Sequence, residues 1–228
     1  MILRGREPTF GERRDYHNGM SDLPTLNADD FEDDPAALAD LLATGGAGFV
    51  AGWPRPDLHA ALRDDLLRLQ AQGELARAAV GRSDGRALRE DIRNDSTCWL
   101  DDPRCGPAAG VFLSRMDALR GALNRTLYLG LQRFEAHYAS YPPGGGYARH
   151  RDRFRDSDAR VVTWVTYLND DWRDADGGAL RLWRTADDWR DLPPVGGSLC
   201  FLSEREHQVL PTRRERHSIA GWFRRDLA

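Results

Sequence analysis

Two histidines and one aspartate, in an H-x-D…H arrangement, carry the clearest chemical signal in this chain. His150 and Asp152 lie two residues apart, and His207 follows far downstream. Two imidazoles and one carboxylate form the facial triad, a ligand set that holds a divalent iron ion and leaves coordination positions open. Residues two apart on a β-strand point to the same face, so His150 and Asp152 can enter one site together. The spacing therefore predicts a mononuclear iron centre.

An H-x-D pair alone is a weak signal, because it is more often a surface histidine followed by a solvated acid. Arg216, which comes soon after His207, strengthens the signal. An iron centre of this kind needs a co-substrate that supplies electrons for O₂ activation, and the dicarboxylate 2-oxoglutarate is such a co-substrate. Burying its distal carboxylate is costly unless a cation pairs with it, and the planar fork of arginine suits a carboxylate. We therefore predict that Arg216 anchors 2-oxoglutarate.

Two tyrosines lie on expected strands near this arginine. Tyr167 ends one strand and Tyr141 ends another, so both are candidate hydroxyl partners for the co-substrate. The alternative is that both are ordinary packed aromatic residues. His137 shares a strand face with Tyr141 and either lines the pocket or is a packed structural histidine. His217, directly after the arginine, is expected to face the exterior.

The composition favours one domain without nucleic-acid or membrane partners. The chain has 228 residues, a net charge of −4 and three cysteines without paired spacing. This length suits a single core, the charge gives no basic field for nucleic acid, and the cysteines favour a reducing compartment. No apolar run approaches the roughly 20 residues of a transmembrane helix. We expect a cytoplasmic protein with a disordered tail over residues 1–25 and one domain over residues 26–228.

Helix signals come first along the chain and strand signals afterwards. Residues 34–128 are expected to be helical support, interrupted by a polar loop or finger over residues 73–98. Residues 131–225 hold short β-branched and aromatic runs separated by turn signals, which predict a mainly β protein with a double-stranded β-helix, or jelly-roll, core. The expected strands are Phe134–Tyr141, Tyr147–His150, Val161–Leu168, Ala179–Trp183, Ser198–Leu202, Gln208–Leu210 and Ser218–Phe223.

Several linked motifs surround these residues. They are Ile92–Asp95 (IRND) with Trp99, Tyr141-Pro142, Gly146–Asp152 (GYARHRD), Arg160–Trp172 (RVVTWVTYLNDDW), Gly177–Leu182 (GGALRL), and His207–Pro211 (HQVLP) with Arg216 and Trp222. Together they resemble the 2-oxoglutarate-dependent prolyl hydroxylases, most closely those of the hypoxia-inducible-factor type and their bacterial relatives. The linked set is far more specific than any single motif in it.

The resemblance implies the same three iron ligands and the same arginine anchor as the residue pattern. It further implies that Tyr167 assists at the distal carboxylate and that Tyr141 lies near the co-substrate. The walls of the pocket would include Trp222, Leu180 and Val165.

The resemblance also implies that Asp95 and Arg160 form an ion pair at the substrate rim. The sequence departs from the family pattern on this side of the pocket. The turn between Tyr141 and His150 is one residue short, the segment before Arg160 is one residue longer, and His137 stands where an apolar residue is usual. These departures weaken the substrate assignment and leave the iron chemistry intact.

The activity that the resemblance implies is hydroxylation of a substrate C–H bond, with succinate and CO₂ as by-products. Fe(II), 2-oxoglutarate and O₂ would be the cofactors and co-substrates, with ascorbate as a further cofactor. The implied substrate is a prolyl residue in a flexible loop of a protein, and a translation factor is a candidate partner. Two alternatives stay open: an oxygenase for a small molecule or another side chain, and a non-catalytic cupin-like metal-binding or sensing module.

Overall fold

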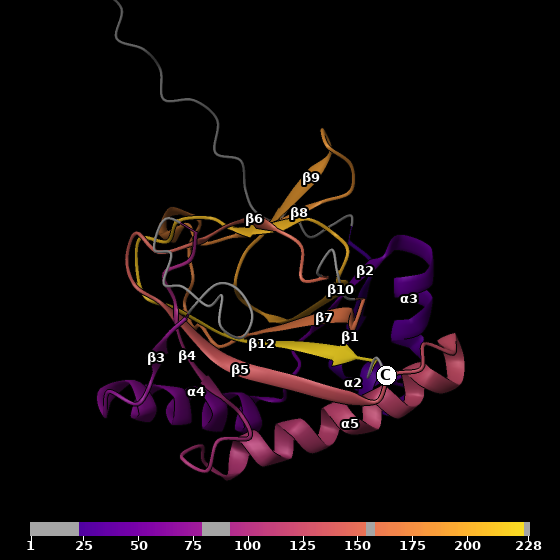
Figure 1. Ribbon diagram of the computed structural model, residues 1–228, viewed down its shortest axis with the longest axis horizontal. Coiled ribbons are helices and arrows are strands. Elements are labelled where there is room, and N and C mark those ends of the chain that lie inside the picture. Colours follow the sequence, from indigo (N-terminus) through magenta and orange to yellow (C-terminus); the bar gives the residue numbers. More distant parts are fainter. Residues whose placement is uncertain (1–22, 79–91, 154–157, 226–228) are drawn as a thin grey trace, which may run out of the picture.

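Two β-sheets face each other in this protein, and helices pack against the outer face of the larger sheet (Figure 1). The computed structural model describes residues 23–78, 92–153 and 158–225. Most of the tail expected over residues 1–25 lies outside the described residues, and so does the middle of the finger expected over residues 73–98.

The larger sheet is mixed and holds most of the strands. Its members are β1 (Thr25–Asn27), β2 (Ala47–Ala51), β3 (Ala76–Arg77), β4 (Ser96–Trp99), β5 (Arg133–Tyr141), β7 (Arg160–Tyr167), β10 (Gly197–Leu202) and β12 (Arg216–Arg224). Their order is β1-β2-β10-β7-β12-β5-β4-β3. β1 and β2 pair in parallel, and the other neighbours are antiparallel. The long antiparallel ladders β5–β12–β7 form the rigid centre of the sheet.

The smaller sheet lies over the centre of the larger one (Figure 1). It contains β6 (Tyr147–His150), β8 (Leu180–Trp183), β9 (Trp189–Leu192) and β11 (His207–Val209), in the order β6-β11-β8-β9. A short 3₁₀ helix, Asp174–Asp176, precedes β8. The central strand β11 pairs with both β6 and β8, so one short sheet gathers three of the segments whose motifs point to chemistry.

The helices are α2 (Ala28–Asp33), α3 (Ala37–Gly45), α4 (Pro56–Ala71) and α5 (Pro107–Leu127). Proline at the first turn of α4 and α5 fixes the backbone for a helix start, and Gly46 ends α3 in the left-handed conformation. The leucines that α4 buries lie three to four residues apart, as one face of an amphipathic helix requires. They are Leu58, Leu62, Leu66 and Leu69.

The two faces of the larger sheet have different roles. Trp164 on β7 and Ile219 and Phe223 on β12 point toward the helices and belong to the main apolar core. The alternate positions on the same strands, among them Val165 and Trp222, point toward the smaller sheet and line a pocket. This alternation follows from the period of two along a strand, and it leaves the inner face free for chemistry.

The predicted fold class is confirmed, and the expected strands appear with small shifts at their ends. The strands form two separately hydrogen-bonded sheets in the described ranges. β1, α2, β3 and β9 were not predicted from the sequence. The expectation that His217 faces the exterior is wrong, because α4 covers the outer face at this point and the residue is buried there, with its Nε2 3.2 Å from Oε1 of Gln70. No helix within the described ranges combines the length and apolar character that crossing a bilayer requires.

Candidate metal centre

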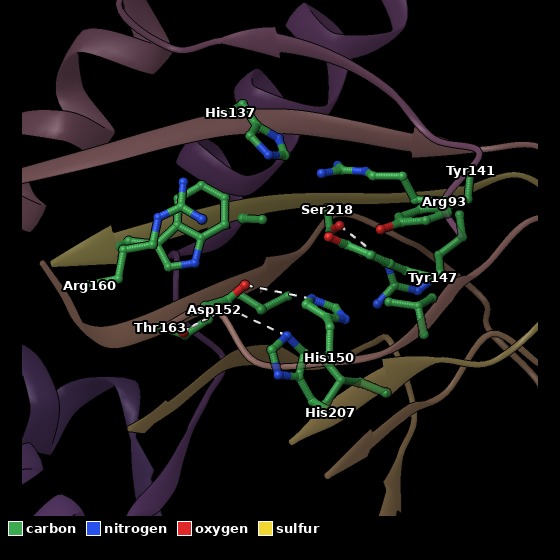
Figure 2. Close-up of a pocket in the computed structure, with 16 residues that line it drawn as sticks. Arg93, His137, Tyr141, Tyr147, His150, Asp152, Arg160, Thr163, His207 and Ser218 are labelled. Carbon is green, nitrogen blue, oxygen red and sulfur yellow. Dashed lines mark hydrogen bonds and ion pairs between the residues drawn. The ribbon is translucent and has the colours of Figure 1, made fainter. Parts of the chain in front are cut away.

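His150, Asp152 and His207 converge at one point between the two sheets (Figure 2). His150 ends β6, Asp152 follows it, and His207 begins β11, directly opposite His150 in the ladder. Nε2 of His150 lies 3.6 Å from Oδ1 of Asp152, and Nε2 of His207 lies 3.4 Å from Oδ2. One candidate ligand atom from each residue lies within 4.8 Å of the others.

Backbone carbonyls fix the orientation of both imidazole rings. Nδ1 of His150 lies 2.7 Å from the carbonyl of Ala148, and Nδ1 of His207 lies 3.1 Å from the carbonyl of Arg205. A carbonyl can only accept, so each Nδ1 carries a hydrogen, and Nε2 is the nitrogen of each ring that faces Asp152. Metal-binding histidines show this arrangement, in which the second nitrogen donates to a carbonyl or carboxylate.

Asp152 is buried and oriented by a hydroxyl pair. Thr163 on β7 donates a hydrogen bond to its Oδ2 at 2.8 Å, and the Thr163 hydroxyl also meets that of Ser203 at 2.9 Å. Burial alone would raise the pKa of Asp152, but His207 and His150 outweigh it and hold this pKa well below its ordinary value. Burial, together with the nearby His150, lowers the pKa of His207 to about 4. A carboxylate beside two imidazole nitrogens is a donor set that suits a divalent cation such as Fe(II).

Arg216 lies at the deep end of the same pocket and is 1% exposed. Its Nε donates to the carbonyl of Gly178 at 2.9 Å, and its Nη1 donates to the hydroxyl of Ser218 at 3.2 Å. Its Nη2 is buried without a hydrogen-bond partner, and no described carboxylate pairs with the guanidinium. A buried, unpaired cation is costly, so this arrangement fits a ligand that brings its own carboxylate.

Gly178 allows the arginine to approach so closely. Its φ is +68°, and a Cβ at this position would lie 3.1 Å from Cβ of Thr212 and 3.2 Å from Cδ of Arg216. A side chain would therefore be strained by the backbone and would push the arginine aside. The second glycine of the GGALRL motif thus has a direct structural reason.

Two further buried polar atoms on strands that line the pocket lack partners among the described residues, one near Arg216 and one farther along β12. They are Oη of Tyr167 and Nε1 of Trp222. The guanidinium carbon of Arg216 lies 5.6 Å from the ring of Tyr167 and 5.3 Å from the ring of Tyr141. Burial raises the pKa of Tyr167 to about 12, with Arg216 opposing it, so the hydroxyl stays protonated and can donate. These orphaned donors support a polar ligand with several acceptor oxygens, as 2-oxoglutarate has.

The structure places the remaining expected pocket residues as follows. Tyr141, Val165, Leu180 and Trp222 line the pocket with the three candidate ligands and Arg216. Tyr167 is not among the lining residues, and it reaches the site through its ring, which lies 5.6 Å from the guanidinium carbon of Arg216. The expected site residues therefore come together from six strands of the two sheets and from the loop after β6.

The expected ion pair between Asp95 and Arg160 is wrong. Asp95 is fully buried and accepts from Nε of Arg93 at 2.7 Å. Arg160 lies 3.0 Å from Oε1 of Glu135 and covers the ring of Trp222 at 3.6 Å. Arg93 and Asp95 stand two apart in an extended segment and share one face, which makes their pairing the local one. Arg160 still lines the pocket. Asp95 does not line it, but it binds Arg93, which does.

Sequence reasoning missed several residues that shape the site. Thr163 and Ser203 orient Asp152, and Ser218 accepts from Arg216. Tyr147 stacks on the ring of His150, with centroids 3.6 Å apart, and Arg93 lies over that tyrosine at 4.6 Å. Strand spacing could have identified Thr163 and Ser218. Thr163 lies two residues from Val165 and Ser218 lies two residues from Arg216, so each shares a strand face with a predicted pocket residue.

Comparisons with known proteins give this geometry a family context. Residues 136–224 match the family model described as the 2OG-Fe(II) oxygenase superfamily. "Egl nine homolog 1" of Homo sapiens is 35% identical over 144 residues, which cover 59% of this chain and 33% of that protein. The chain therefore spans about a third of this curated relative.

Solved structures match over more of the chain. A prolyl-4-hydroxylase from Pseudomonas putida is 46% identical with a TM-score of 0.76, and the match covers 84% of this chain and 98% of that one. A prolyl hydroxylase from Trichoplax adhaerens, solved with a hypoxia-inducible-factor oxygen degradation domain peptide fragment, is 26% identical with a TM-score of 0.72. That match covers 83% of this chain and 90% of the other.

Proposed function

Because this chain belongs to the 2OG-Fe(II) oxygenase superfamily, we propose that it is a 2-oxoglutarate- and Fe(II)-dependent dioxygenase that hydroxylates a prolyl residue. One observation carries the proposal. A carboxylate with two oriented imidazoles shares a pocket with a buried arginine whose Nη2 has no described partner. Storage of a metal ion does not require that arginine, whereas a dicarboxylate co-substrate does.

The three converging side chains would hold the metal. His150 and His207 offer Nε2 lone pairs, and Asp152 offers a carboxylate oxygen that Thr163 keeps in place. Bound Fe(II) supplies O₂ activation, with the oxidative decarboxylation of 2-oxoglutarate to succinate and CO₂ providing two electrons. The open coordination positions of a three-residue site leave room for this chemistry.

Arg216 would pair with the distal carboxylate of 2-oxoglutarate, and Tyr167 would donate a further hydrogen bond to it. Tyr141 would border the co-substrate from β5. Val165, Leu180 and Trp222 would provide the apolar walls, which exclude water and so strengthen the pairing with the arginine. The residues on the large sheet thus orient the co-substrate, and those on the small sheet and its flanking loops hold the metal.

The substrate proposal is a prolyl residue in a flexible loop of a protein. Two kinds of support favour it: the matched relatives are named as prolyl hydroxylases, and one neighbour holds a peptide fragment. A translation factor remains a candidate partner. The pocket is also lined by Arg93, Arg160 and Trp222. The arginines can donate hydrogen bonds to peptide carbonyls, and the indole ring can pack against an apolar pyrrolidine ring.

The test uses the full chain with Fe(II), 2-oxoglutarate and O₂. The probe is a library of synthetic peptides, each with one central proline and varied flanking residues. We expect succinate without peptide at a slow rate, faster succinate with preferred peptides, and the mass gain of one oxygen atom on proline. Succinate without any oxidised proline would favour a small molecule or another side chain as substrate. The absence of both products would contradict the proposed activity.

A further inference from the structure

His137 is a buried histidine in the pocket that the proposed metal and co-substrate sites do not use. It is 5% exposed and lies on β5, between Trp99 of β4 and Ala220 of β12 in the ladder. Its ring turns from β5 toward the pocket (Figure 2). The family resemblance gives it no role, because an apolar residue is usual at this position.

The ring has a defined hydrogen-bonding state. Nδ1 lies 3.0 Å from the carbonyl of Tyr138, and a carbonyl only accepts, so Nδ1 carries the hydrogen. Burial lowers the pKa of His137 to about 4, and the cationic Arg93 acts in the same direction while Asp95 opposes it. The ring is therefore neutral near pH 7, and Nε2 presents a lone pair. No described residue donates to this Nε2.

Aromatic neighbours hold the ring in place. Trp99 meets it edge-on with centroids 5.3 Å apart and an interplanar angle of 90°, and Trp222 lies at 5.4 Å. Trp99 itself is 40% exposed. His137 thus lies between the buried Trp222 of the pocket lining and the partly exposed Trp99.

The position of β5 separates His137 from the metal ligands. Asp152 is tied to Thr163 on β7, whereas His137 lies on β5, with β12 between them in the sheet. Adjacent strands are about 4.8 Å apart, so two strand spacings, on the order of 10 Å, divide the two positions across the floor. Along β5, His137 lies four residues, roughly 13 Å, from Tyr141, which faces Arg216 in the ladder. His137 is therefore displaced both from the candidate metal ligands and from the proposed co-substrate anchor, which leaves it available to a substrate.

The polar groups on that side are mainly donors. Arg93 and Arg160 line the pocket there and can only donate. A peptide in an extended conformation presents carbonyls, which these arginines can bind, and N–H groups, which require an acceptor. Nε2 of His137 offers a neutral acceptor in the same pocket.

We propose that His137 is a specificity-determining residue, whose Nε2 accepts a hydrogen bond from a backbone N–H of the peptide substrate beside the target proline. The inference rests on the proposed function for the existence of a peptide substrate. In this chain, a polar side chain would thus bind the peptide backbone from a position where an apolar residue is usual in the family that the sequence resembles.

Two variants separate this role from a structural one. The amide of His137→Gln reaches about as far as Nε2 and can still accept in the pocket, whereas the amide of His137→Asn occupies the position of Nδ1 and can only keep the contact with Tyr138. Each is the matched control for the other. We expect His137→Asn to raise KM for a preferred library peptide about tenfold and His137→Gln to raise it at most about threefold.

A structural role predicts the reverse order, with Asn tolerated and Gln impaired, and that order would overturn the proposal. Equal effects of the two variants would also overturn it. The proposed function is tested separately by succinate formation in the wild-type protein without peptide. A wild-type protein that makes succinate but hydroxylates no library peptide would leave the oxygenase assignment standing and contradict the inference about His137.

A second measurement addresses the donor on the peptide. Each backbone amide of a preferred peptide is replaced in turn by an ester, which removes one N–H and keeps the shape. We expect one ester position to weaken anaerobic peptide binding, followed by tryptophan fluorescence, about tenfold with the wild-type protein and very little with His137→Asn. If every ester weakened binding to the wild-type protein and to His137→Asn by the same factor, the result would contradict the proposed hydrogen bond.

Discussion

The hydroxyl of Thr163 donates a hydrogen bond to Oδ2 of Asp152 over 2.8 Å, and it comes from the opposite sheet. This contact ties the candidate metal ligands of the small sheet to the rigid ladder of β7 and β12. Ser203 completes the hydroxyl pair at 2.9 Å. The orientation of the carboxylate therefore depends on the large sheet as well as on the loop that carries Asp152.

Replacing Thr163 with valine keeps the shape and removes the hydroxyl. We expect Fe(II) affinity to fall by about 10- to 100-fold, as is typical when a partner of a metal ligand is lost. Thr166→Val is the matched control, because Thr166 is equally buried on β7 but bonds to Trp164 and Ser198 on the other face. Anaerobic calorimetric titration with Fe(II) measures both variants. Similar losses of affinity in the two would argue against a specific role for Thr163.

Arg216→Gln removes the cation that faces the proposed co-substrate site. We expect KM for 2-oxoglutarate to rise at least about 100-fold, since a buried charge pair is worth roughly 3 kcal/mol or more when one partner is removed. Arg214→Gln is the control, because Arg214 lies two residues before Arg216 but its side chain is 47% exposed, and it pairs with Oδ2 of Asp176 at 3.5 Å. Succinate formation against 2-oxoglutarate concentration measures the effect. Equal KM values for the two variants would refute the anchor.

Because the Arg216 guanidinium has no described carboxylate partner, replacing it with an apolar side chain should not destabilise the ligand-free protein. Arg216→Met replaces a buried cation that has no described carboxylate partner with an apolar chain of similar length. We expect the free energy of unfolding of the metal-free protein to stay the same or rise by about 1–2 kcal/mol. We also expect 2-oxoglutarate with Fe(II) to stabilise this variant less than the wild type. Urea unfolding with and without ligand tests both; a large loss of stability in the metal-free variant would mean that the arginine is already compensated.

Alanine substitutions at two glycines with nearly the same φ can distinguish the cost of backbone strain from the cost of side-chain crowding. Gly178 (φ +68°) would place a Cβ against Thr212 and Arg216, whereas a Cβ at Gly130 (φ +67°) has no described atom within 4 Å. We expect Gly130→Ala to cost about 1 kcal/mol and Gly178→Ala about 2–3 kcal/mol in urea unfolding. Only Gly178→Ala should also weaken 2-oxoglutarate binding. Equal costs would show that the close approach to Arg216 does not constrain this position.

His137 predicts a pH dependence of stability. Burial lowers its folded pKa to about 4, below the ordinary value of about 6.5, so the unfolded state binds more protons between these values. The contribution is complete above about pH 6.5 and is lost as pH falls toward 4. Compared with His137→Gln, the metal-free wild type should lose about 2 kcal/mol more between about pH 7.5 and about pH 5. Parallel urea midpoints for the two proteins would contradict a buried neutral ring.

Sequence patterns predicted the convergence of His150, Asp152 and His207 and the positions of the strands because both depend on local rules. Spacing of two on a strand placed His150 and Asp152 on one face, and the β-branched runs marked the central strands. β9 (Trp189–Leu192) was not predicted as a strand, because its short segment has no alternating apolar pattern. Strand parity also placed His217 on the outer face correctly, but nothing in the sequence showed that α4 covers that face.

Side-chain partners across strands were harder to predict. The pairing of Asp95 with Arg93, rather than with Arg160, depends on which face of an extended segment meets β5. The link from Thr163 to Asp152 joins two sheets and has no signature in either segment alone. Such contacts follow from tertiary packing, and the sequence offered only parity as a guide.

An anaerobic titration of the protein with Fe(II) and 2-oxoglutarate tests the shared metal and co-substrate site most directly. Bidentate binding of 2-oxoglutarate to iron gives a weak visible charge-transfer band. The wild-type protein should develop this band, Arg216→Gln should require far more 2-oxoglutarate, and Asp152→Ala should not develop it. A band of normal intensity and midpoint in Asp152→Ala would contradict the ligand assignment on which the proposed function depends.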